Sequence, residues 1–322
     1  MRIISLIAAF LMVLAAPLTA AEKIDKLVIA GPRAPVTPPL AYIIEAGLLD
    51  SVAEKVELRV WKTTDQLRAL IIGKEAHFAA TPAHLSAKLY NKGVPIRLMN
   101  VSVWGDLWIM SSDPNIKSIS DLAGKEMSMS GKNGTPDILF SLLADKLGVK
   151  DDIKVSFVPN MVAALTEIGS GRAEHALLSE PHATRALTLS ADKERKLYRA
   201  VGISQQWGEV LNTTPRIARA GVSALPKIMN RPDVIEAFQA AYKEATEWCV
   251  ANPEKAGEIA AKYVDGFKAP SVAMSLSTGA VEFVSAQDGK ANIMKYFQVI
   301  LDAKPKSIGG KLPDDGLFWS AK

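Results

Sequence analysis

Short apolar segments alternate with helix-like segments along most of the chain. The strand-like runs are 27–30, 56–60, 77–80, 96–101, 126–130, 153–158, 175–178 and 197–203. Between them, apolar residues recur at helical spacing, as in Ile138, Leu139, Leu142 and Leu143. Because this alternation is typical of βαβ units, the pattern predicts an α/β fold with parallel strands.

The pattern becomes mostly helical after residue 222. Residues 231–251 fit one long helix with Pro232 near its start, and a second helix is expected from Pro253 to about Val264. The chain has 322 residues, which exceeds the length at which a single hydrophobic core usually stops growing. We therefore expect two lobes, each with its own core.

The first residues have the pattern of a secretory signal peptide. Arg2 is the only charged residue before Glu22, residues 3–16 are apolar except for Ser5, and small residues follow. This apolar run is shorter than the roughly 20 residues that a membrane-spanning helix needs. We therefore expect residues 1–21 to be removed on export, leaving a soluble periplasmic protein.

Composition and charge argue against several classes of function. The chain is 48% hydrophobic, and 38 basic against 34 acidic residues leave a net charge of only +4, with both signs interspersed. This balance does not fit a nucleic-acid-binding surface. The chain lacks a Gly-x-Ser-x-Gly elbow, a His-Glu-x-x-His motif and paired cysteines, so no metal or cofactor is expected. The single cysteine, Cys249, is expected to be buried and unreactive.

Four polar residues precede a proline where a strand-like run passes into a helix. They are Thr37, Thr81, Thr135 and Glu180. Proline suits the first position of a helix, so the residue before it is expected to be the N-cap. Parallel strands end at one edge of the sheet, where open α/β sheets bind ligands, so these residues are expected to face one crevice. Helix N-termini there would suit an anion, although ordinary capping explains the same pattern.

The segment 131–137 is the strongest candidate among these junctions. Asn133, Gly134 and Thr135 could bring backbone and hydroxyl groups close to a ligand at a helix start. Pro136 removes an amide donor, however, and Asp137 already complements the helix dipole. The segment also differs from a phosphate-binding P-loop, because its lysine precedes the turn.

Three further residues are candidates beside the expected crevice. Arg33, in the loop after the first strand, could pair with an anionic group. Trp104 could form an aromatic wall, or it could pack between the lobes. His182 follows Glu180 closely, and the two would be the acid–base pair if the protein were an enzyme.

Several motifs, in this order and spacing, resemble those of a known family. They are TDQL (64–67), GKEAHFA (73–79), ISDLAGK (119–125), GRAEHA (171–176) and the stretch 248–256. The chain is similar to nitrate/sulfonate/taurine-type periplasmic solute-binding proteins of ABC importers, a group that includes relatives binding thiamine-precursor pyrimidines. The resemblance implies a type II periplasmic-binding fold, with the ligand cleft between two α/β lobes. Lobe 1 would comprise residues 22–112 and 208–322, and lobe 2 residues 113–207, with hinges near Asp113 and 202–208.

The resemblance also implies which residues contact the ligand. By position, lobe 1 contributes the loop 31–37 and Thr81, and lobe 2 contributes residues 133–135 and Glu180. With the residue-level candidates, the expected ligand-binding set is Arg33, Thr37, Thr81, Trp104, Asn133, Gly134, Thr135, Glu180 and His182. The carboxylates of Asp137 and Glu180 are unexpected in a sulfonate site, so a cationic or heteroaromatic ligand stays open.

The resulting prediction is a monomeric binding protein and not an enzyme. It would capture a small solute, such as a sulfonate or nitrate anion, and deliver it to an ABC membrane permease with a cytoplasmic ATPase. A thiamine-precursor-like pyrimidine is the alternative ligand. The alternative from a different class is an enzyme on the same fold that uses Glu180 and His182.

Overall fold

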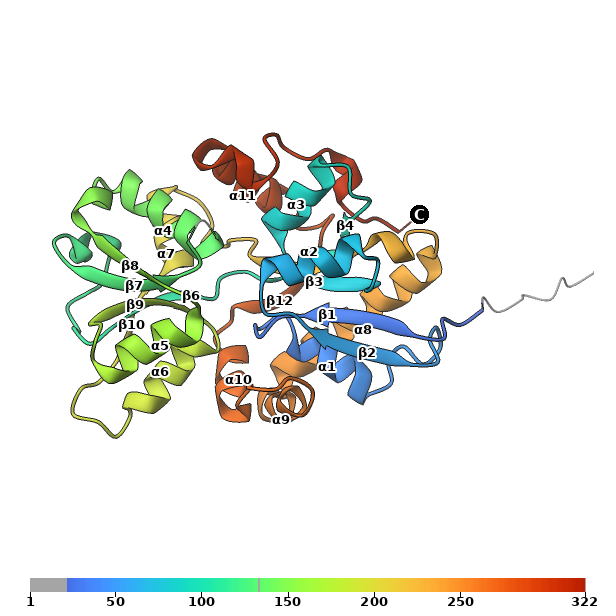
Figure 1. Ribbon diagram of the computed structural model, residues 1–322, viewed down its shortest axis with the longest axis horizontal. Coiled ribbons are helices and arrows are strands. Elements are labelled where there is room, and N and C mark those ends of the chain that lie inside the picture. Colours follow the sequence, from blue (N-terminus) through green and yellow to red (C-terminus); the bar gives the residue numbers. More distant parts are fainter. Residues whose placement is uncertain (1–21, 133, 322) are drawn as a thin grey trace, which may run out of the picture.

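The computed structural model describes residues 22–132 and 134–321, which form two α/β lobes (Figure 1). The two-lobed α/β class predicted from the sequence is confirmed. The predicted signal peptide, residues 1–21, and Asn133 lie outside the described residues. Over the residues that are described, none of the helices has the length and apolar content needed to cross a membrane.

Lobe 1 is built on a mixed sheet with the strand order β12-β5-β11-β3-β1-β2, and β4 pairs with β11. β1 is parallel to β2 and β3, whereas β11 runs antiparallel to β3 and β5. Its strands are β1 (Leu27–Gly31), β2 (Val56–Val60), β3 (Phe78–Pro82), β4 (Arg97–Leu98), β5 (Asn100–Val103), β11 (Ala220–Ala224) and β12 (Val281–Ser285). Its helices are α1 (Pro38–Glu45), α2 (Thr64–Ile72), α3 (Ala83–Asn91), α8 (Pro232–Ala251), α9 (Pro253–Tyr263), α10 (Ala269–Leu276) and α11 (Lys290–Ala303).

Lobe 2 has a second mixed sheet with the order β10-β6-β9-β7-β8. β7 is parallel to β8 and β9, and β6 runs antiparallel to β9 and β10. Its strands are β6 (Leu107–Ser111), β7 (Glu126–Ser130), β8 (Lys154–Val158), β9 (His175–Ser179) and β10 (Tyr198–Gly202). Its helices are α4 (Thr135–Lys146), α5 (Met161–Ser170), α6 (His182–Ser190) and α7 (Ile203–Val210).

All the strand-like runs in the sequence overlap observed strands, but the expectation of parallel sheets is only partly right. The first strand after each crossing between the lobes, β6 in lobe 2 and β11 in lobe 1, is antiparallel to the strands beside it. β12 was not expected, because it lies in the helical C-terminal quarter and its alternation is weak. It forms because β5 offers an unpaired edge.

The chain crosses between the lobes at residues 104–106 and 211–219. The first crossing lies before the expected boundary at 112–113, because β6 pairs within the lobe 2 sheet. The second lies after the expected boundary at 207–208, because α7 packs on lobe 2. Asp113, expected near a hinge, therefore follows β6 within lobe 2.

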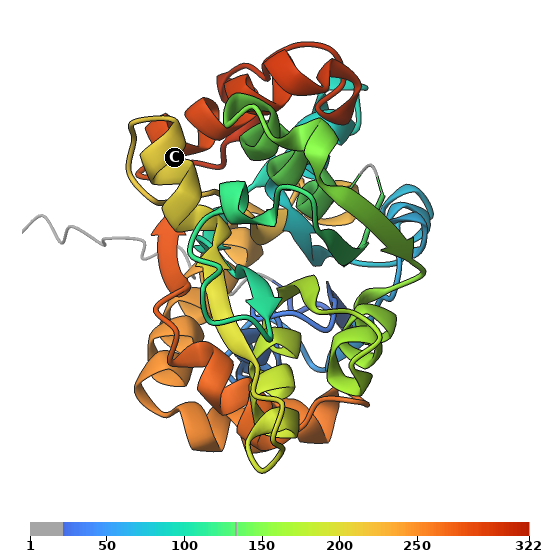
Figure 2. The same cartoon turned by 90° about the vertical axis from the view of Figure 1, so that its left-hand side faces the viewer.

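The lobes contact one another at two opposite edges. At one edge, α11 packs against α3 of its own lobe and α4 of lobe 2, and the rings of Trp207 and Tyr296 lie 6.2 Å apart. At the other edge, α10 packs against α6. Figure 2 shows α11 (red) and the α9–α10 pair (orange) at these two edges.

Cys249 is fully buried in the core of lobe 1, beside α9 and α10. Burial raises the pKa of its thiol to about 12, so the thiolate is scarcely populated at neutral pH. The expectation of a buried thiol is confirmed.

Candidate functional site between the lobes

A cavity of about 190 Å³ lies between the two lobes. Lobe 1 lines it with Arg33 and the segment from Gly266 to Ser271, and lobe 2 lines it with residues of α5 and α6. We call it the interlobe cavity. Its charged lining residues are Arg33, Arg185 and Lys268, and its apolar ones include Val162, Leu165 and Phe267. Among the described residues, no carboxylate lines it.

A larger cavity of about 340 Å³ lies at the amino ends of the lobe 2 strands, where β7 and β9 begin. It is formed by lobe 2 alone, and its lining carries both lysine and arginine and three glutamates. Parallel α/β sheets bind ligands at the opposite, carboxyl ends of their strands. The interlobe cavity, which includes the residues that follow β1 and β9, is therefore the better candidate site.

Arg33 reaches the interlobe cavity from the loop after β1. Its Nη2 lies 3.2 Å from Asp265 Oδ2, and the carboxylate of Asp265 is fully exposed to solvent. Within the described part of the chain, the Nε of Arg33 is buried and has no hydrogen-bond partner. The guanidinium thus keeps donor capacity for a further hydrogen bond.

His182 faces Arg33 from the first turn of α6. Burial, followed by the positive charge of Arg33, lowers the pKa of His182 to about 4. The imidazole is therefore neutral near pH 7, and among the described residues its buried Nδ1 has no partner. The two lobes bring a guanidinium and a neutral imidazole together at the cavity, and an acceptor group between them could bond to both.

Glu180 does not present its carboxylate to the cavity. It is fully buried, and Arg199 donates to its Oε1 from Nη2 at 2.6 Å and from Nε at 3.2 Å. The amide of Thr184, in the first turn of α6, donates to Oε2 at 3.1 Å. The negative charge is neutralised inside lobe 2, so it does not weaken an anion site. In the described chain no hydrogen bond joins Glu180 to His182, so the acid–base pair of the enzyme alternative is not formed.

Thr135 contacts the opposite lobe directly. Its Oγ1 lies 3.2 Å from Nδ1 of His84, which is on α3 of lobe 1, and the hydroxyl of Tyr296 lies 3.5 Å from the same nitrogen. Burial lowers the pKa of His84 to about 3, with smaller effects from the charges of Arg219 and Lys88. The neutral imidazole thus joins α3, α4 and α11 where the lobes meet.

Arg219 and Asp106 connect the two crossing segments. Arg219 Nε donates to Asp106 Oδ1 at 2.8 Å, and the two side chains are 12% and 5% exposed. The carbonyl of Asp106 accepts from the amide of Glu180, and the carbonyl of Arg219 accepts from the amide of Ala83. The pair therefore links the starts of α6 and α3, one in each lobe.

Two predicted ligand contacts are fully buried within lobe 1. Thr37 donates its hydroxyl to the carbonyl of Pro32 at 2.6 Å. The hydroxyl of Thr81 lies 2.8 Å from that of Ser86 and 2.9 Å from that of Ser223 on β11. These hydroxyls stabilise the strand ends of lobe 1 rather than face the cavity.

Trp104 packs in the first crossing segment. It is 5% exposed, its Nε1 donates to the carbonyl of Glu282, and Arg216 stacks 4.5 Å from its ring centroid. Of the two roles considered for it, the geometry supports packing. Gly134 lies at the lobe boundary beside Thr135, and its amide donates to the carbonyl of Gly131.

The N-cap prediction is correct only at Thr37. The N-caps of α3, α4 and α6 are Pro82, Gly134 and Pro181, each displaced by one residue from the predicted position. Four further residues at the lobe contacts and the cavity were not predicted from the sequence as site residues: His84, Arg185, Arg219 and Lys268. His84 could have been predicted, because it lies just after the Thr81-Pro82 junction at the start of a helix. The other three are basic residues in no distinguishing sequence pattern.

Comparison with solved structures identifies the fold. An ABC transporter protein from Parabacteroides distasonis has a TM-score of 0.75 at 23% identity, covering 94% of this chain and 100% of the other. The periplasmic aliphatic sulphonate binding protein SsuA from Escherichia coli has a TM-score of 0.70 at 17% identity, covering 92% and 93%. The desulfurization enzyme DSZB has a TM-score of 0.58 at 14% identity, covering 89% and 94%.

These similarities establish the type II periplasmic-binding fold that the resemblance implied, and at such identities they establish the fold alone. No curated protein sequence gives a significant match. The sequence model of the family described as "NMT1/THI5 like" matches residues 54–256, which is well over half of the chain and extends through both lobes. The chain therefore belongs to the NMT1/THI5-like family.

Proposed function

We propose that this protein is the solute-binding component of an ABC import system and that it captures a small organic anion between its lobes. The observation that carries the proposal is the interlobe cavity, where both lobes contribute cationic side chains and no described carboxylate lines the wall. The cavity volume of about 190 Å³ is below the range typical of pockets that bind drug-sized ligands, which supports a small solute.

The charges around the cavity favour an anion. The carboxylates of Glu180 and Asp106 are each paired with a largely buried arginine, and the exposed carboxylate of Asp265 pairs with Arg33 outside the cavity lining. Arg185 and Lys268, in contrast, have no ion-pair partner within 4 Å among the described residues. Each charge-assisted hydrogen bond contributes about 1.5–3 kcal/mol, so a few such bonds could provide much of the roughly 8 kcal/mol that corresponds to micromolar affinity.

The apolar part of the lining supports an organic anion over nitrate. Val162, Leu165 and Phe267 line the same cavity, and Val162 is 53% exposed. A short alkyl group on the ligand would cover this surface on closure, gaining about 25 cal/mol for each Å² removed from water. An alkanesulfonate combines the two features that the cavity offers.

Capture and transfer would follow from lobe movement. A ligand that contacts both lobes binds the closed form better than the open form, so it shifts the population toward closure. We propose that the closed form is presented to a membrane permease in the periplasm after removal of residues 1–21. The ABC transporter and periplasmic sulphonate-binding descriptions of the structural relatives support this assignment.

The enzyme alternative has less support. DSZB shares the fold, so the fold itself is compatible with catalysis. In this chain, however, the carboxylate of Glu180 is already bonded to Arg199 and Thr184, and it has no described bond to His182. A general base needs a positioned partner, which this pair does not provide.

The test is calorimetric titration of the mature protein with ethanesulfonate, nitrate and 4-amino-5-hydroxymethyl-2-methylpyrimidine. We expect ethanesulfonate to bind most tightly and to be recovered unchanged after incubation. Tight binding of the pyrimidine alone would contradict the anion assignment. Conversion of a bound compound, detected by mass spectrometry, would contradict the receptor assignment.

A further inference from the structure

We propose that Gly266 is a positioning residue for the ligand site, because its lack of a side chain allows the Arg33 guanidinium to face lobe 2. The proposal rests on the proposed function, because it concerns the orientation of Arg33 toward the proposed anion. Gly266 lies between α9 and α10, far from Arg33 in sequence, and both residues line the interlobe cavity.

The guanidinium of Arg33 lies directly against the backbone of Gly266. A Cβ atom at position 266 would be 2.7 Å from Arg33 Cζ, 2.8 Å from Nη2 and 2.9 Å from Nη1. Carbon and nitrogen atoms do not approach so closely without bonding, so any larger residue would displace the guanidinium. Because the displaced group is the end of a flexible side chain, the change moves Arg33 without unfolding the lobe.

The ion pair with Asp265 does not explain the position of Arg33 by itself. The Asp265 carboxylate is fully solvent-exposed, and exposed pairs of this kind contribute little because water and salt screen them. The absence of a Cβ atom at Gly266 is therefore a condition for this position of the guanidinium. Asp265 then orients one edge of it through Nη2.

The resulting position matters because it faces the other lobe. The charge of Arg33 acts on His182, which lines the cavity from α6. The buried Arg33 Nε and His182 Nδ1 both have no partner in the part of the chain that the structure describes. Buried polar atoms are normally paired by protein groups or by water, so these two nitrogens from opposite lobes are available to a ligand group that enters the cavity.

The experiment compares Gly266→Ala with Gly279→Ala, using ethanesulfonate as the probe. Gly279 also has a positive φ, +75° against +84° at Gly266, but an added Cβ there meets nothing within 4 Å. The two substitutions therefore impose similar backbone strain, and only the first displaces Arg33. We measure Kd by calorimetry, melting temperature, and Kd for Arg33→Ala and the double variant Arg33→Ala/Gly266→Ala.

We expect Gly266→Ala to weaken binding about tenfold or more, and Gly279→Ala to bind as the unsubstituted protein does. In the Arg33→Ala background, Gly266→Ala should have no further effect, because it acts through Arg33. Equal affinities for the two glycine variants would overturn the inference, as would a full additional loss in the double variant. If the unsubstituted protein does not bind ethanesulfonate, the anion assignment itself fails, and that result is distinct from either of these.

Discussion

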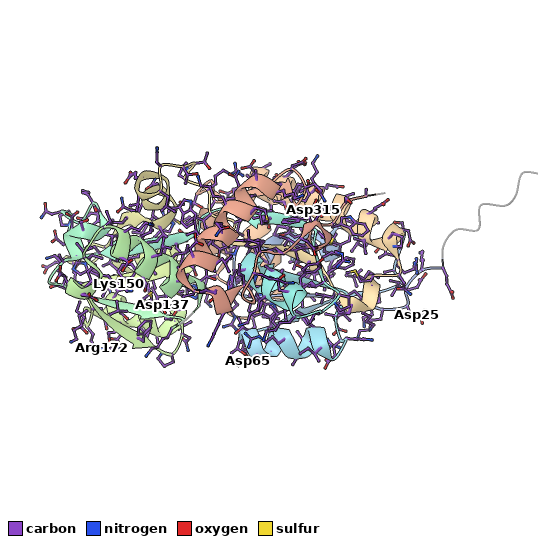
Figure 3. The ribbon with its side chains drawn as sticks, turned by 90° about the horizontal axis from the view of Figure 1, so that it is seen from above. Asp25, Asp65, Asp137, Lys150, Arg172 and Asp315 are labelled. Atoms are coloured by element: carbon purple, nitrogen blue, oxygen red, sulfur yellow. The ribbon has the colours of Figure 1, made fainter. Side chains whose placement is uncertain are left out.

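Lys304, which follows α11, places its Nζ 3.4 Å from Asp137 Oδ2 on α4, so an ion pair joins the two lobes. The Asp137 side chain is 9% exposed, and Ser141 donates to its other oxygen at 2.9 Å. Figure 3 shows Asp137 on lobe 2, beside the helix α11 that comes from lobe 1. The carboxylate of Asp137, which is unexpected in a sulfonate site, is thus part of the contact between the lobes.

Lys304→Met is expected to shift the protein toward the open form and to weaken ligand binding about fivefold, since a partly exposed pair contributes about 1 kcal/mol. Small-angle scattering of the ligand-free protein would detect the larger radius of gyration. Lys306→Met is the matched control, because Lys306 is exposed and forms no described ion pair. An unchanged radius and affinity for Lys304→Met would show that the pair does not restrain the lobes.

Thr135→Val is expected to weaken binding several-fold, because it removes the hydroxyl that contacts Nδ1 of His84 across the lobes. A single neutral hydrogen bond contributes about 1 kcal/mol. The melting temperature should change little, since Val is similar in size to Thr. Thr188→Val, at an exposed position of α6, is the control, and calorimetry is the measurement. Equal ligand affinities for both variants would show that the contact of Thr135 with His84 does not contribute to binding.

Glu180→Gln is expected to destabilise the protein and not to alter ligand preference. The change leaves Arg199 without its charged partner inside lobe 2, at a cost of about 3 kcal/mol, the lower end for a buried pair because Arg199 is 24% exposed. Chemical denaturation would measure the loss, with exposed Glu174→Gln as control. A stable variant with a changed ligand preference would instead place Glu180 in the binding site.

Stability is expected to fall as the pH falls below about 6.5, partly because of His182. Its pKa is lowered to about 4 in the folded protein, mainly by burial, so the unfolded chain takes up a proton that the folded chain does not. The stabilisation is complete above pH 6.5 and is lost as the pH approaches 4. Since His182 is half-buried, we expect a loss of about 1 kcal/mol between pH 6.5 and 5.

Denaturation curves of His182→Gln at the two pH values test this contribution. The variant should lose about 1 kcal/mol less than the unsubstituted protein over this interval. Identical losses in both proteins would show that His182 is accessible to protons in the folded state.

Local sequence patterns determined most of the elements of this protein and the region of its candidate site. Apolar runs such as 27–30 became strands, and residues that follow β1, β7 and β9 lie where the lobes meet. These features follow from backbone periodicity and from the rule that parallel strands end at one edge. They need no knowledge of distant contacts, so the sequence alone was sufficient.

Only the tertiary structure decided which side chains are available to a ligand. The hydroxyl of Thr81 is occupied because Ser223 lies beside it, and the carboxylate of Glu180 is occupied because Arg199 reaches it from β10, two strands away in the sheet. The guanidinium of Arg33 can face lobe 2 because Gly266 has no side chain to occupy the same space. Each outcome depends on a partner that is distant along the chain. Hydrogen bonding and steric contact act between neighbours in space, and folding alone determines those neighbours.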